Sequence, residues 1–165
     1  MSHLLHNKKW NTGKGLEILF QNIENVVSQH ASRQKKIFIG TDSFKTNKNT
    51  CFVTAVCILH SDNGGGRYYF YKEKMPTKRY HNLTSRITEE ARRSVEVAEY
   101  FIENYEIKPK LIELHLDVSS ANGKAKTSKI SDMLQGYVRG YGLSCKIKPD
   151  AWKFLCLGLR IFLQL

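Results

Sequence analysis

The sequence predicts one α/β domain built on a mixed β-sheet with helices packed on its faces. Three observations indicate this fold. Strand-like segments come first, a long helix-like segment follows them, and a second helix separates two further strand-like segments. A length of 165 residues suits one domain with a single core. The expected order is a helix, then β-β-β-α-β-α-β, then a short tail.

Apolar residues at helical spacing predict a first helix close to the N-terminus. They are Leu16, Leu19, Phe20, Ile23, Val26 and Val27. We therefore expect residues 1–36 to form a helical extension packed on a domain of residues 37–152. Residues 153–165 would follow as an atypical apolar tail.

Three strands are expected next in the chain. Residues 37–43 form an apolar, β-branched run typical of a buried strand, and residues 51–60 and 67–74 follow after short polar or Gly-rich turns. Consecutive strands of this kind pair in antiparallel fashion. The aromatic run 68–71, beside Arg67, could stack nucleic-acid bases. More often such a strand belongs to the core on one face and is covered by a helix on the other.

A long helix is predicted from Leu83 onward, because apolar residues recur there at helical spacing until Pro109 prevents continuation. Residues 111–118 again have the pattern of a buried strand. The second helix is expected to begin at Ser128 or Ser131 and to end near Gly140 or Gly142, and residues 143–148 supply the fifth strand.

The charge balance favours a polyanionic partner. Lys and Arg number 26 against 15 Asp and Glu, which gives a formal net charge of +11 and a pI near 9.6. The simpler alternative is a basic protein whose charge serves solubility.

Cysteine usage and the two ends of the chain indicate a cytoplasmic protein. The four cysteines show neither zinc-ligand spacing nor a dense disulfide framework, so we expect reduced thiols. Residues 1–10 lack the apolar core of a secretory signal. The apolar run 154–165 is too short to span a bilayer, so no membrane partner is expected.

Two acidic residues end predicted buried strands, and a third lies on the long helix. Asp42 closes the first strand and Asp117 the fourth, where ligands gather in α/β sheets. A charged group at such a position is unfavourable unless it is paired or binds a cation. Glu90 lies on the helical stripe that faces the sheet, so it is the preferred third carboxylate, with Glu89 as the alternative. His115 could bind metal, but a buried, hydrogen-bonded histidine is the more common outcome.

Several short motifs, in order along the chain, resemble the bacterial YkuK-type ribonuclease H-like family. They are Gly40-Thr41-Asp42-Ser43, Arg86-Ile87-Thr88-Glu89-Glu90, His115-Leu116-Asp117-Val118, Gly136-Tyr137 with Gly140-Tyr141-Gly142, and Ile147-Lys148-Pro149-Asp150. The resemblance covers about residues 37–151. It implies a ribonuclease H-like fold with a mixed five-stranded sheet of order 3-2-1-4-5, in which strand 2 is antiparallel.

The resemblance also implies a metal site. It assigns Asp42, Glu90 and Asp117 as catalytic carboxylates that bind two Mg²⁺ or Mn²⁺ ions, with Asp150 as the available fourth ligand. The apolar segment 153–165 departs from the family pattern, in which a small-residue helix with another Asp would follow.

The expected activity is hydrolysis of RNA, DNA or a hybrid by a two-metal mechanism. The expected contacts to nucleic acid are Lys124, Lys126, Lys129, Arg86 and Lys148, although the lysine-rich loop could equally be a solvated surface loop. Two other classes stay open: a non-catalytic nucleic-acid-binding module, and an interaction protein that oligomerises through its apolar tail.

Overall fold

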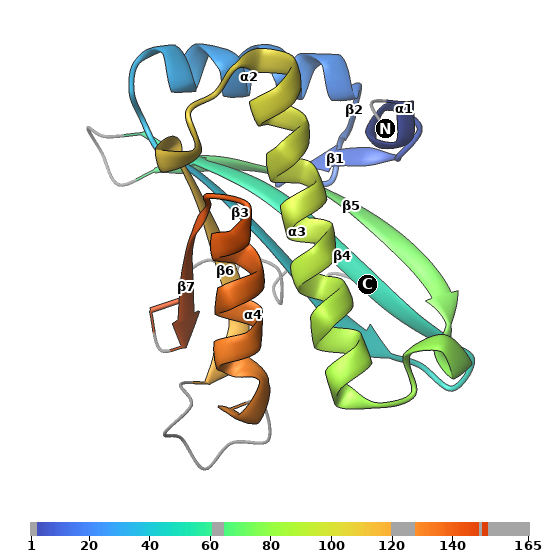
Figure 1. Cartoon of the computed structure of the whole chain (residues 1–165). Helices are drawn as coiled ribbons and strands as arrows, with labels where there is room; N and C mark the ends of the chain where they lie inside the picture. The colour runs from blue at the N-terminus through green and yellow to red at the C-terminus, as the bar shows by residue number, and fades with distance from the viewer. Residues whose placement is uncertain (1–2, 61–64, 120–127, 149, 152–165) are drawn as a thin grey trace.

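The computed structural model describes residues 3–60, 65–119, 128–148 and 150–151, and Figure 1 shows their arrangement. The helices are α1 (His3–His6), α2 (Phe20–Ser32), α3 (Leu83–Tyr105) and α4 (Ser128–Gly140), with short 3-10 turns η1 (Thr77–Tyr80) and η2 (Pro109–Leu111). The strands are β1 (Trp10–Thr12), β2 (Glu17–Ile18), β3 (Ile37–Lys45), β4 (Asn49–Leu59), β5 (Gly66–Pro76), β6 (Ile112–Ser119) and β7 (Ser144–Lys148).

The sheet is mixed, as predicted, but it has seven strands in the order β2-β1-β5-β4-β3-β6-β7. The prediction of five strands was therefore wrong, and so was the predicted order for the whole sheet. β1 and β2 extend the sheet because β1 pairs antiparallel with the free edge of β5. The strands β5-β4-β3-β6-β7 lie side by side within it, with β4 antiparallel to both neighbours and β6 parallel to β3 and β7.

The first long helix starts later than its apolar spacing suggested. Glu17 and Ile18 pair with β1, so helix α2 begins only at Phe20. Leu16 and Leu19, expected on the buried face of this helix, are 66% and 73% exposed. Strand pairing with β1 takes precedence over helical spacing in this segment.

Helices α2, α3 and α4 contribute to one hydrophobic core with one face of the sheet. This core takes alternate residues of the strands, such as Ile37 and Ile39 of β3, together with Val27 of α2, Val95 of α3 and Leu134 of α4. A smaller cluster around Val53 and Phe70 lies on the opposite face. The aromatic segment of β5 is mostly core, since Tyr69, Phe70 and Tyr71 are buried.

The central strands part where the candidate site lies. β3 and β6 pair in parallel from Ile37 with Ile112 to Gly40 with His115, and no further. At the last pair a Cβ atom on Gly40 would approach the carbonyl oxygen of His115 to 3.2 Å, so glycine suits this close contact. Beyond this pair β3 and β6 are no longer paired with each other.

Cys51, Cys57 and Cys145 are free thiols, and the fourth cysteine lies outside the described residues. The predicted apolar tail, residues 153–165, also lies outside them. Within the part of the chain that the structure describes, no helix combines the length and the apolar character needed to cross a membrane.

Candidate metal centre at the carboxyl ends of β3 and β6

Asp42 and Asp117 occupy equivalent positions on neighbouring parallel strands. Each lies two residues beyond the last β3–β6 pair, which joins Gly40 to His115. A register shift between β6 and β7 also falls between His115 and Ser119, so Asp117 stands where the ladder is irregular. Strand ends that diverge in this way bring two carboxylates to one edge of the sheet.

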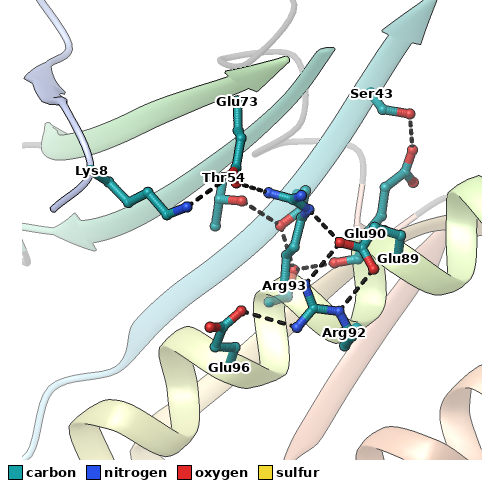
Figure 2. A network of polar contacts seen from close by, with 11 residues as sticks. Lys8, Ser43, Thr54, Glu73, Glu89, Glu90, Arg92, Arg93 and Glu96 are labelled. Carbon is teal, nitrogen blue, oxygen red and sulfur yellow. Dashed lines mark hydrogen bonds and ion pairs between the residues drawn. The ribbon is translucent and has the colours of Figure 1, made fainter. Parts of the chain in front are cut away.

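Helix α3 supplies Glu90, which points at the end of β3. Its side chain is only 6% exposed and accepts a hydrogen bond of 2.5 Å from the Ser43 hydroxyl. Glu89 points elsewhere and binds Arg92 and Arg93, as Figure 2 shows. Of the two adjacent glutamates, Glu90 is thus the one directed at Asp42 and Asp117.

The three acids interact electrostatically. The pKa of Asp42 is raised to about 6; burial is the largest cause, the nearby Asp117 carboxylate also raises it, and the hydrogen bond from the Ser43 amide opposes the shift. The pKa of Glu90 is raised to about 8; burial is the largest cause, the Ser43 hydrogen bond opposes the shift, and the charges of Asp42 and Asp117 contribute to it. Negative charge is therefore disfavoured here, and a cation would stabilise the ionised forms.

Two cationic side chains already accompany the acids. The Lys148 ammonium nitrogen lies 2.5 Å from Oδ1 of Asp117, at the end of β7. Arg86, in the first turn of α3, lowers the pKa of both Asp42 and Glu90 through its positive charge. Both residues were expected to contact nucleic acid, and both lie beside the predicted carboxylates.

The donor set suits a hard divalent cation in its chemistry, since it consists of carboxylate oxygens. The buried Oδ1 of Asp117 accepts no hydrogen bond from a described residue and has only the ion pair with Lys148. The side chains are not preassembled, however: among the described residues, no three His, Cys, Asp or Glu side chains form a group that could hold a metal. A metal would have to compete with Lys148 and with the Ser43 hydroxyl.

The other predicted site residues are less closely connected. Asp150 is exposed in the turn after β7 and forms no hydrogen bond or ion pair with another described residue. Lys124 and Lys126 lie outside the described residues, as does the side chain of Lys129. His115 is buried beside Glu113, with 3.3 Å between its Nε2 and a carboxylate oxygen, and burial lowers its pKa.

Ser43 is a site residue whose role the sequence analysis missed. Its amide donates to Asp42 and its hydroxyl to Glu90, so it connects two of the three acids. One layer deeper, the Ser94 hydroxyl donates to Thr41 and ties the same turn of α3 to β3. Ser43 follows Asp42 directly in the chain, and only the fold reveals that it also meets α3.

The comparisons with known proteins agree with this geometry. A family model described as "Ribonuclease H-like" matches residues 18–157. No curated protein and no solved structure matches the chain. The match covers most of the 165 residues and includes β3, α3 and β6, the elements that carry the three acids. The chain therefore belongs to the ribonuclease H-like family, the YkuK-type family that its motifs resemble.

Proposed function

We propose that this protein is a metal-dependent nuclease that hydrolyses phosphodiester bonds of RNA, DNA or a hybrid at Asp42, Glu90 and Asp117. The observation that carries the proposal is the electrostatic effect of these acids on the pKa values of Asp42 and Glu90 at one edge of the sheet. Asp117 raises the pKa of Asp42, and both raise that of Glu90, as expected for carboxylates that need a cation between them.

The protein would hold two Mg²⁺ or Mn²⁺ ions through carboxylate oxygens. When bound, such ions activate a water and stabilise the leaving oxygen of a phosphodiester. Ser43 would orient Glu90, because its hydroxyl donates to that carboxylate. Arg86 and Lys148 would meet the phosphate, since both already lie beside the acids and carry positive charge. Asp150 is the available fourth ligand.

A cleavage assay tests the proposal. Labelled RNA, DNA and hybrid duplexes are incubated with the full chain in Mg²⁺ or Mn²⁺, beside Asp42→Asn and Asp117→Asn. We expect cleavage of at least one substrate that depends on the metal and falls about 100-fold or more in either variant, since loss of even an outer-shell partner costs 10- to 100-fold. Cleavage that survives both substitutions would refute the assignment.

A second candidate function is nucleic-acid binding without catalysis. The ion pair between Lys148 and Asp117 favours it, because an internal ammonium can neutralise this carboxylate without a metal. This alternative predicts salt-sensitive binding to nucleic acid and no cleavage in Mg²⁺ or Mn²⁺.

A further inference from the structure

Cationic side chains gather at the opposite end of the sheet from the acids. Between the end of α2 and the junction of β4 with β5 is a hollow of about 230 Å³. Its walls include Arg33, Lys35, Arg67, His30 and His60, and no acidic residue is among the described residues that line it. The hollow therefore concentrates positive charge in a concave surface, which is the arrangement that binds anions.

The positive charge has two separate structural sources. Arg33 caps the C-terminus of α2 and His30 lies in its last turn, positions where the helix dipole favours cations. His60 and Arg67 belong instead to the chain at the end of β4 and in β5, so the helix dipole does not account for them. Two unrelated segments converge on one hollow with the same sign of charge.

The electrostatics of His30 agree with an excess of positive charge. Burial lowers the pKa of this imidazole, and the nearby charges of Lys35, His60 and Arg33 lower it further. The hydrogen bond between its Nε2 and the Lys36 carbonyl opposes that shift. Arg33, Lys35 and Arg67 carry the permanent positive charge of this hollow.

The site is independent of the proposed metal centre. The end of α2 lies where β3 begins, whereas Asp42 lies near the other end of that strand (Figure 1). The five residue-to-residue steps from Ile37 to Asp42 span about 16 Å at the rise of a strand. A long nucleic acid could reach both places, but neither needs the other in order to bind.

We propose that the hollow between α2 and the β4–β5 end of the sheet is a phosphate-binding site for a nucleic-acid strand. Arg33 and Arg67, which line the hollow from α2 and from β5, contact the phosphate. Sequence selectivity is not expected from this site, because phosphate contacts carry no base information.

The test uses the full chain without divalent metal, so that binding is measured apart from cleavage. The probes are fluorescein-labelled single-stranded oligodeoxythymidylate, followed by anisotropy over a salt series, and inorganic phosphate, followed by NMR shifts of the histidine rings. The variants are Arg33→Gln, Arg67→Gln and both together. Arg139→Gln is the matched control, because Arg139 is also an exposed arginine at a helix C-terminus, that of α4.

We expect Arg33→Gln and Arg67→Gln each to weaken oligonucleotide binding about tenfold and to reduce the salt slope by about 1, whereas Arg139→Gln stays near wild type. Phosphate-induced shifts of the His30 and His60 rings should disappear in the double variant. Unchanged oligonucleotide affinity in the double variant would overturn the proposal, even if inorganic phosphate still bound. An equal loss of oligonucleotide affinity in Arg139→Gln would also overturn it. Such a loss would show that the overall positive charge of the protein, and not this hollow, attracts the oligonucleotide.

Discussion

Lys148 holds its ammonium nitrogen 2.5 Å from Oδ1 of Asp117, so a cation of the chain itself already neutralises one of the three acids. The same charge lowers the pKa of Asp42. A divalent metal that bound here would have to displace this lysine from Asp117. Lys148 is thus the side chain that would have to move between the metal-free structure and the proposed metal-bound centre.

Substituting Lys148 should therefore strengthen metal binding. We expect Lys148→Met to bind Mn²⁺ about two- to fivefold more tightly than wild type in calorimetric titration, since a partly exposed ion pair contributes up to about 1 kcal/mol. Lys146→Met is the control, because Lys146 lies on the same strand and is exposed. Weaker Mn²⁺ binding in Lys148→Met would mean that the lysine supports the site instead of competing for it.

The pH dependence of stability should report on Glu90. Its pKa in the folded chain, about 8, lies above the ordinary value of 4.5, so the folded state prefers the protonated acid. Stability from this preference is complete below about pH 4.5 and is lost as the pH rises through about 8.

Glu90→Gln should remove this loss of stability at high pH, because glutamine does not titrate. In urea unfolding of the metal-free protein, the variant should exceed wild type by on the order of 2 kcal/mol at pH 8 and by little at pH 5. Glu103→Gln, at an exposed acid of the same helix, is the control. An equal effect of Glu90→Gln at both pH values would contradict the raised pKa.

Arg93 should matter more for stability than its neighbour Arg92. Arg93 is 3% exposed, bonds Glu73 and Glu89, and stacks over the Phe52 ring at 4.5 Å (Figure 2 shows the polar contacts). Its removal takes one cationic partner from each of two carboxylates, although Lys8 still bonds Glu73 and Arg92 still bonds Glu89, and it opens space in the packing. We expect Arg93→Ala to lower the free energy of unfolding by about 3 kcal/mol.

Arg92→Ala provides the comparison, because that side chain is 48% exposed and bonds only at the surface of α3. A loss below about 1 kcal/mol is expected. Both values come from urea unfolding. Similar losses of unfolding free energy in the two variants would show that the burial of Arg93 does not add to the stability of the protein.

Gly40 should tolerate no larger residue. An added Cβ would meet the His115 carbonyl oxygen at 3.2 Å, which presses β3 away from β6 next to Asp42. Gly40→Ala should lower the free energy of unfolding by about 1–2 kcal/mol and weaken Mn²⁺ binding.

The same substitution at Gly136 should have the opposite effect. A Cβ there meets nothing within 4 Å, and the residue lies inside helix α4. We expect Gly136→Ala to add about 0.5–1 kcal/mol, measured by urea unfolding. A Gly40→Ala variant as stable as wild type would show that the close contact between β3 and β6 does not require glycine at position 40.

The long, periodic elements of the fold could be predicted from the sequence. Helix α3 and strands β3 and β6 have strong apolar patterns, and the placement of Asp42 and Asp117 near the carboxyl ends of these strands followed from them. The prediction that Asp42 closes its strand was wrong, because β3 continues to Lys45 through its pairing with β4. Strands β1 and β2 could not be predicted, since three and two residues are too few for any periodicity. Their place in the sheet depends on pairing with distant β5, which local pattern does not contain.

The acids of the candidate site could be predicted from the sequence, but the residues that form hydrogen bonds with them could not. Helical phase separated Glu90 from Glu89, because one faces the sheet and the other meets Arg92 and Arg93. The hydrogen bond from Ser43 to Glu90 joins residues 47 positions apart. Contacts of this kind arise from tertiary packing, and residue spacing carries no signal for them.

The number of metal ions that the full chain binds reports on the proposed centre at Asp42, Glu90 and Asp117 without the need for a known substrate. Mn²⁺ is titrated into wild type, Asp42→Asn and Asp117→Asn, and bound metal is measured by the loss of the free-ion electron paramagnetic resonance signal. The account predicts up to two ions per wild-type chain and a clear loss of binding in both variants. Equal Mn²⁺ binding by all three proteins, or none by wild type, would contradict it.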